Sequence, residues 1–167
     1  MTMKVIIESE QFNRTLKRMT HEIIERNEDL SKIILVGIEK KGTPIAKEIQ
    51  NLIYQFEGVK VALEVIDITP HRDDDKKNAN IVIKFSESIF DKIIILVDDV
   101  LYTGRTVRAA MDAVMDIGRP SKIELAVFVD RGHRELPIRA DFIGKNIPTS
   151  REEKIICDFL NRQVILK

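Results

Sequence analysis

The sequence predicts an α/β protein with a central, mainly parallel, twisted sheet that is covered by helices. Two observations predict this class. Strand-like and helix-like segments alternate along the chain, and the strand-like segments are short continuous apolar runs. Such runs are typical of parallel strands, because both of their faces are covered. The length of 167 residues fits a single domain spanning 1–167 with one sizeable core, and no linker is evident.

Four apolar runs, each bounded by polar, glycine or proline residues, are expected to be the strands of this sheet. They are residues 33–38, 59–65, 93–97 and 123–129.

Three amphipathic segments are expected to be helices. The first, about 10–27, has one apolar sector formed by Phe12, Leu16, Met19 and Ile23. The second is expected to begin with Thr43 as N-cap and Pro44 at the first helical position, and to end before Gly58. The third, 106–117, is expected to stop at Gly118 in a left-handed conformation.

Composition excludes several classes of protein. Charged residues make up 32% and apolar residues 44% of the chain, so intrinsic disorder is not its main character. Because 27 Lys and Arg balance 27 Asp and Glu, binding to nucleic acid would need a localised basic surface. Neither a membrane nor DNA is an expected partner, and the absence of a signal-like apolar block favours a cytoplasmic location. The single cysteine, Cys157, is interpreted as a small buried apolar residue.

The segment 94–106 carries the strongest chemical signal. A buried strand is expected to end at Val97, followed by Asp98 and Asp99 and then by a Thr-Gly-Arg-Thr turn that opens a helix. In α/β sheets, ligands bind beyond the carboxyl ends of the strands. The turn can offer backbone N–H groups and hydroxyls to a phosphate, and the carboxylates can hold sugar hydroxyls or a hard cation such as Mg²⁺. A phosphorylated ribose fits both halves.

This segment resembles the phosphoribosyl-diphosphate (PRPP) signature of the type I phosphoribosyltransferases. A second block, residues 129–150, is similar to the members of that family that also regulate bacterial pyrimidine operons. The resemblance extends from about residue 6 to 153. It implies the type I phosphoribosyltransferase fold, with a flexible loop and with a small hood built mainly from about 129–150 and the chain ends.

The resemblance also implies roles for individual residues. Asp98 and Asp99 would contact the ribose hydroxyls. The residues implied at the 5′-phosphate and its turn are Val100, Leu101, Tyr102, Thr103, Gly104, Arg105 and Thr106. The hood over the nucleobase corresponds to the start of the second block, at Val129, Asp130 and Arg131. Because Asp98 and Asp99 are adjacent, they are expected to point in different directions, which does not suit a glycosidase pair.

The family's pyrophosphate loop corresponds to residues 39–42. Lys40 and Lys41 supply positive charge, and Gly42 would let the backbone approach a diphosphate. Glu39 places a like charge beside that diphosphate, and Lys41 stands where the family has an arginine fork. The neighbouring pattern 37–44 nearly spells a P-loop, but Thr43 occupies the lysine position and Pro44 lacks an N–H, so an NTPase is rejected.

The long polar segment 67–80 is expected to be a mobile functional loop or a projecting hairpin. In the family the corresponding loop closes over the reactants, and Arg72 is the residue implied at the pyrophosphate. A surface ion pair of Arg72 with Asp73 or Asp74 is the alternative.

The implied reaction is uracil plus PRPP giving UMP and diphosphate, with Mg²⁺ as cofactor, held mainly by PRPP and by Asp98 or Asp99 through water. No side chain is needed as a nucleophile. Two alternatives stay open: a regulator with little or no catalytic activity, and a phosphoribosyltransferase for another nucleobase.

The resemblance also implies binding of pyrimidine-operon leader mRNA that responds to UMP or UTP, by a protein that forms homodimers or higher homo-oligomers. The RNA-binding residues implied are Arg14, Lys17, Arg18, His21 and Arg26 of the first helix, with His133, Arg134, Arg139 and Lys145 of the second block. A solvated helix face and ordinary histidines are the alternatives.

Overall fold

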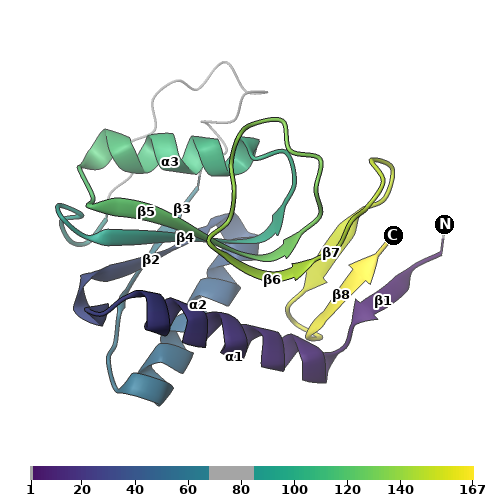
Figure 1. Cartoon of the computed structure of the whole chain (residues 1–167), viewed down its shortest axis with the longest axis horizontal. Helices are drawn as coiled ribbons and strands as arrows, with labels where there is room; N and C mark the ends of the chain where they lie inside the picture. Colours follow the sequence, from purple (N-terminus) through teal and green to yellow (C-terminus); the bar gives the residue numbers. More distant parts are fainter. Residues whose placement is uncertain (1, 68–84) are drawn as a thin grey trace.

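The computed structural model describes residues 2–67 and 85–167, and within them a five-stranded parallel sheet forms the centre. Its strands are β2 (Ile33–Ile38), β3 (Ala62–Ile66), β4 (Ile93–Leu101), β5 (Lys122–Asp130) and β6 (Phe142–Asn146). Their spatial order is β3-β2-β4-β5-β6, and each neighbouring pair is parallel. The expected α/β class is confirmed (Figure 1).

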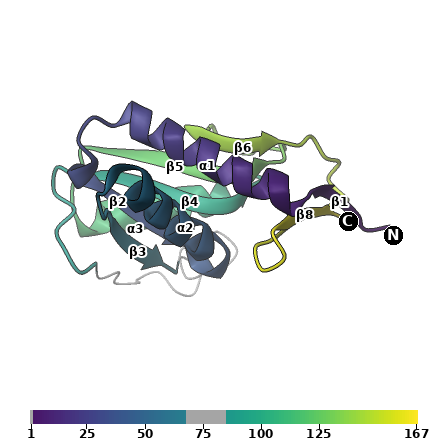
Figure 2. The ribbon, with the colours of Figure 1, turned by 90° about the horizontal axis from the view of Figure 1, so that it is seen from below.

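Helices cover both faces of this sheet. Helices α1 (Ser9–Arg26) and α2 (Glu39–Glu57) pack on one face, and α3 (Arg105–Ile117) packs on the other, as Figures 1 and 2 show. Two apolar clusters fill the two interfaces. The expected core sector of the first helix is confirmed, because Phe12, Leu16, Met19 and Ile23 are all fully buried.

The two chain ends form a second, antiparallel sheet at one end of the molecule. It consists of β1 (Lys4–Ile7), β8 (Gln163–Leu166) and β7 (Ile155–Asp158), in that order. A short 3-10 turn, Leu30–Lys32, leads into β2. No helix among the described residues is long and apolar enough to cross a membrane.

Two predicted features of the sheet are wrong in detail. The prediction had four strands, but β6 pairs with β5 as a fifth. The apolar run of β6 is interrupted by Gly144 and Lys145, so the sequence does not mark it as a strand. Gly144 is nevertheless buried, because the backbone of β5 packs directly against it: an added Cβ would lie 2.3 Å from the Phe128 carbonyl oxygen. Strand β4 also continues to Leu101, so Asp98 and Asp99 lie within the strand and not after it.

Two predicted helix ends are also wrong. Helix α2 begins at Glu39, so Thr43 is not its N-cap and Pro44 lies inside it, where the Thr43 hydroxyl donates to the Glu39 carbonyl at 2.6 Å. Gly118 is extended (φ 170°) and not left-handed, and it is closely packed against Ile89. The expected end of α2 is confirmed, since Gly58 is left-handed (φ 71°) and donates to Tyr54.

Candidate active site

A cavity of about 1170 Å³ opens at the carboxyl ends of β2, β3 and β4, beside the first turns of α2. The chain leaves β2 toward β3 on one side, while β4 lies on the other, so the cavity sits where the strand order reverses. Such reversal points are where open α/β sheets bind ligands. The cavity is lined by Glu39, Lys40, Lys41, Thr43, Pro44, Lys47, Glu48, Asn51, Val65, Ile66, Asp67, Asp98, Asp99, Val100, Thr106 and Phe159.

The two predicted carboxylates form the floor of this cavity. Both Asp98 and Asp99 are buried, and each uses one oxygen to accept the backbone N–H of the following residue at 2.8 Å. Burial, followed by the charge and hydrogen bond of Asp99, raises the pKa of Asp98 well above its usual value. The expectation that the two side chains diverge is therefore wrong, because they meet at one cavity.

The segment predicted as the pyrophosphate loop is the first turn of α2. Lys40 and Lys41 are exposed and line the same cavity as the carboxylates. Glu39 has a left-handed backbone (φ 56°), which turns the chain sharply from β2 into the helix. A Cβ on Gly42 would lie 2.3 Å from the Val97 carbonyl oxygen, so only glycine lets this turn approach β4 so closely. The glycine thereby brings the lysines to the aspartates.

The predicted phosphate turn follows β4 and opens α3. Gly104 is left-handed (φ 93°), the Arg105 N–H donates to the Thr103 hydroxyl at 3.2 Å, and the helix begins at Arg105. The first turn of a helix presents N–H groups without intrahelical partners. Val100 and Thr106 line the cavity together with the aspartates. Residues 101–105 of the predicted phosphate turn are not among its lining residues.

The predicted hood segment is fastened to this turn. Arg131 is buried over the Tyr102 ring, with its guanidinium carbon 4.0 Å from the ring centroid, and it donates to the Thr149 hydroxyl at 3.0 Å. Arg134 donates to the Tyr102 carbonyl at 2.7 Å and to Asp130 at 2.6 Å. The three residues predicted for the hood, 129–131, do not line the cavity, although these bonds hold them next to the phosphate turn.

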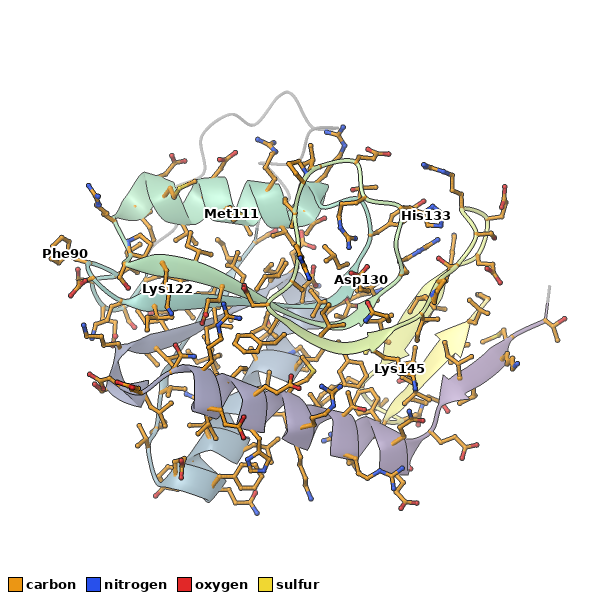
Figure 3. All side chains as sticks on the ribbon, in the orientation of Figure 1. Phe90, Met111, Lys122, Asp130, His133 and Lys145 are labelled. Atoms are coloured by element: carbon orange, nitrogen blue, oxygen red, sulfur yellow. The ribbon has the colours of Figure 1, made fainter. Side chains whose placement is uncertain are left out.

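Most of the predicted RNA-binding residues are exposed, and several of the exposed ones also have partners within the chain. Lys17, Arg139 and Lys145 are exposed. Arg18 donates to the Gly144 carbonyl and pairs with Glu22 at 2.9 Å, so it joins α1 to the edge strand β6. Figure 3 shows Lys145 close to α1, with Asp130 and His133 where the chain leaves β5.

The other members of this basic set have specific partners. Arg14 pairs with Glu10 at 3.0 Å. Arg26 pairs with the buried Glu124 at 3.2 Å and with Asp141 at 3.3 Å. His21 stacks on Phe56 with ring centroids 4.4 Å apart, and the His133 ring contacts the Thr149 carbonyl at 2.5 Å. Arg26, whose side chain is half exposed, and Arg134 thus link neighbouring elements to one another.

Sequence reasoning gave no place in the site to seven of the cavity residues: Thr43, Pro44, Lys47, Glu48, Asn51, Val65 and Phe159. Lys47 follows Lys40 by seven residues and so shares its helix face, a signal that could have been read. Phe159 lies in the C-terminal tail, where no motif marks it. Its neighbour Cys157 is partly buried against the core, and burial raises the pKa of its thiol to about 12, with the charges of Asp99 and Asp158 adding to the effect.

Arg72 and most of the long polar segment lie outside the described residues. Asp67, the last residue before that gap, lines the cavity. Within the described part of the chain, no cluster of three His, Cys, Asp or Glu side chains could hold a metal by itself. The buried pair of aspartates nevertheless offers the hard oxygen ligands that Mg²⁺ accepts one or two at a time when a phosphate ligand supplies the rest. The donor set therefore fits Mg²⁺ held jointly with a phosphorylated substrate.

Comparison with known proteins adds to this geometry. Residues 6–156 match the family model of the phosphoribosyl transferase domain. The bifunctional protein PyrR of Bacillus cereus (strain AH820) is 54% identical over 160 residues, which cover 92% of this chain and 89% of that protein. The PyrR protein of Bacillus anthracis (strain CDC 684 / NRRL 3495) matches to the same extent.

Solved structures resemble the fold at low identity. Hypoxanthine phosphoribosyltransferase from Trypanosoma cruzi, in complex with the product IMP, has a TM-score of 0.76 at 17% identity and covers 98% of this chain and 89% of its own. The corresponding enzyme from Staphylococcus aureus has a TM-score of 0.69 at 19% identity, covering 87% and 77%. Both have the same arrangement of sheet and helices.

Proposed function

The chain belongs to the phosphoribosyl transferase family, and on that premise we propose that it is a uracil phosphoribosyltransferase that also regulates pyrimidine operons by binding leader RNA in the cytoplasm. The carrying observation is the cavity itself. It brings two buried aspartates, two lysines and the start of α3 to one point at the reversal of the strand order. Its acidic and basic walls suit the two halves of PRPP. The identity to PyrR proteins supports the pyrimidine assignment.

In the proposed reaction, N1 of uracil forms a bond to C1′ of PRPP, the bond from C1′ to the diphosphate oxygen breaks, and the N1 proton is released. Asp98 and Asp99 hold the ribose hydroxyls, and the turn from Val100 to Thr106 holds the 5′-phosphate. Lys40 and Lys41 bind the departing diphosphate. Placed charges of this kind lower the barrier without a nucleophilic side chain.

Two further groups complete the proposed site. Val129, Asp130 and Arg131 cover the uracil ring, and Arg72 contacts the diphosphate from the long polar segment. Mg²⁺ bound with PRPP would neutralise charge on the leaving diphosphate. The protein's own part is to orient the ribose through the aspartates and to exclude water from C1′.

The test is diphosphate release from PRPP with and without uracil, in the presence of Mg²⁺. We expect uracil-dependent release that falls at least 100-fold in Asp99→Asn, because ribose orientation is lost. Asp112→Asn is the matched control: it removes a carboxylate of α3 that pairs with Arg108 at 2.7 Å outside the cavity, and it should retain activity. Release that is equal with hypoxanthine or cytosine, or absent with every base, would refute the uracil assignment.

RNA binding is the second proposed activity, and the observation that favours it is that the exposed lysines Lys17 and Lys145 lie on the contacting elements α1 and β6. Lys17, Arg139 and Lys145 would contact phosphates directly, with Arg14, Arg18, His21 and His133 beside them. Arg26 and Arg134 would act by holding this surface in shape, since both are bound to neighbouring elements. We also propose that the protein self-associates, so that the surfaces of two subunits can contact one RNA.

The two activities can be measured on one preparation. We expect UMP or UTP to strengthen the binding of a pyrimidine-leader hairpin, measured by mobility shift. Lys17→Ala should weaken the shift while leaving uracil-dependent turnover unchanged, because Lys17 lies outside the cavity. A shift that is indifferent to nucleotide would contradict the regulatory proposal.

A further inference from the structure

The turn between β7 and β8 reaches the cavity from the C-terminal tail. Phe159 lines the cavity, and Figure 2 shows this turn beside α2. The turn continues to Arg162, whose backbone is left-handed (φ 55°) although it is not a glycine. A non-glycine residue in that conformation persists where its surroundings hold it in place. The contacts of Arg162 are therefore informative.

Arg162 joins three elements through one guanidinium. It pairs through both terminal nitrogens with the two carboxylate oxygens of Glu48 on α2, and it donates to the Asn13 side chain of α1 at 3.2 Å. Its guanidinium carbon lies 4.5 Å from the centre of the Phe159 ring and 5.8 Å from that of Phe12. The hydrogen bonds that Arg162 donates to Glu48 raise the pKa of Arg162 above its ordinary value. A planar, forked cation is needed to make all of these contacts.

Glu48 presents an electrostatic problem that Arg162 solves. Glu48 lines the same cavity as Lys40, Lys41 and Lys47, where a diphosphate is proposed to bind. An unpaired carboxylate there would repel that anion, since partly buried charges are poorly screened. The Glu48 side chain is 22% exposed and the Arg162 side chain 31%, so the pair is largely shielded from solvent. Glu48 lines the cavity, and Arg162 lies beside it.

Phe159 is fixed by the same contacts. Its ring packs edge-on against Phe12 with centroids 5.9 Å apart, and the Arg162 guanidinium lies near both rings. Phe12 is itself fully buried and packs against Phe128 of β5, with the two rings tilted by 38°. The ring therefore has little freedom, and it gives the cavity a rigid apolar wall next to the charged groups.

From these contacts we infer that Arg162 is a positioning residue for the anionic ligand of this cavity: it neutralises Glu48 and fixes Phe159 as the wall, so that the C-terminal tail completes the diphosphate end of the site. This inference rests on the proposed function for the identity of the ligand. It assigns a role to a part of the chain outside the sequence motifs.

The test compares Arg162→Ala with Arg162→Ala/Glu48→Gln, measuring KM for PRPP and kcat for uracil-dependent turnover, and the Kd of PRPP by calorimetry. We expect Arg162→Ala to raise KM and Kd about tenfold, with kcat changed less than about twofold, because an uncompensated carboxylate then faces the diphosphate. Removing that charge in the double variant should bring both constants back to within about threefold of the wild type. Arg162→Lys should lie between the two, since it keeps charge without the fork.

Phe159 is tested separately. Phe159→Ala should raise the KM for PRPP several-fold. Phe159→Leu should have a KM close to that of the wild type, because leucine keeps an apolar wall. Lys32→Ala is the control for the loss of an ion pair between elements. Lys32 pairs with Asp91 at 3.5 Å at the amino ends of the strands, away from the cavity, so the KM for PRPP should stay unchanged. Thermal unfolding of each variant checks that it is folded.

The outcomes separate this inference from the proposed function. If Arg162→Ala is folded yet binds PRPP as tightly as the wild type, or if Glu48→Gln restores nothing, Arg162 only stabilises the tail and the inference is wrong. If the wild type binds PRPP but turns over no nucleobase, the enzymatic proposal fails, and the Kd values of the variants still decide the role of Arg162. If the wild type does not bind PRPP at all, both fail together.

Discussion

The carboxyl group of Asp98 is buried within β4 and lies next to a second carboxyl group. Its pKa is raised because burial and Asp99 both oppose its ionisation. A carboxyl group with a folded pKa above its unfolded value binds its proton more tightly in the folded chain. Its stabilising contribution is therefore present below the unfolded pKa and is lost as pH rises through the folded pKa. At neutral pH the ligand-free protein carries this cost, which a bound ligand can offset.

Asp98→Asn should therefore stabilise the ligand-free protein while removing activity. Asparagine keeps the oxygen that accepts the Asp99 N–H, but it has no charge to bury. We expect a gain on the order of 1 kcal/mol at pH 8, or about 2–4 °C in Tm. The gain should shrink as pH falls toward 4, since the wild-type carboxyl then becomes protonated. Calorimetry at several pH values measures this, with Asp112→Asn as the exposed control; a gain that is absent, or constant with pH, would contradict the account.

Residues with a chemical motif could be predicted from the sequence, and residues without one could not. Asp98, Asp99, Lys40 and Lys41 were predicted, and all four line one cavity. Glu48 and Phe159 were not, because their place depends on how the tail folds back over α2. The side chains of Asp98 and Asp99 were expected to point in different directions. That expectation did not consider that both residues can line one cavity near the carboxyl end of the strand.

At the scale of elements, the first turn of α2 decides the geometry of the cavity. Gly42 allows the helix to start directly against β4, so that Lys40 and Lys41 face the aspartates. The sequence placed the start of this helix at Thr43 because Pro44 favours the first helical position. Backbone packing against Val97 moved the start to Glu39, since tertiary contact outweighs a local preference.

Gly42→Ala should separate α2 from β4. The added methyl group would lie 2.3 Å from the Val97 carbonyl oxygen, so the helix must shift, at a cost of about 1–3 kcal/mol. We expect a lower Tm together with a KM for PRPP raised at least tenfold.

Gly144→Ala is the matched control, because its methyl group would meet the Phe128 carbonyl oxygen at the same 2.3 Å, in β6 and outside the cavity. It should lower Tm by a similar amount while the KM of the folded protein stays near that of the wild type. Equal effects of both variants on KM would mean that Gly42 has no local role.

The sheet itself was predictable, apart from its edges. The four apolar runs became β2 to β5, because continuous apolar patterns mark strands that are covered on both faces. Strand β6 lacks such a run, and in the three strands of the chain ends the apolar runs are no longer than three residues. They are short and partly exposed, and their pairing depends on distant partners such as the Arg18 contact to Gly144.

For the whole molecule, charge balance hides a local basic surface. The chain has no net charge, yet Lys17 and Lys145 lie exposed on neighbouring elements, α1 and β6. If this surface binds RNA phosphates, the logarithm of the binding constant should fall linearly with that of the salt concentration, because counterions are released.

We expect a slope of about −2 to −4, as for roughly three to five phosphates. Lys17→Ala and Lys145→Ala should each make the slope shallower by about 1. The slope is measured by filter binding of a leader hairpin at salt concentrations from about 50 to about 300 mM. Lys32→Ala, which lies at the amino end of β2, is the control. An unchanged slope in all three variants would place the RNA-binding surface elsewhere on the protein.

The most direct test of the whole account is a crystal structure of the protein with UMP. The account predicts the phosphate at the N–H groups of the turn 103–106 and the ribose hydroxyls within hydrogen-bond distance of Asp98 and Asp99. A well-ordered nucleotide bound anywhere else, with this turn and these carboxylates unoccupied, would contradict it.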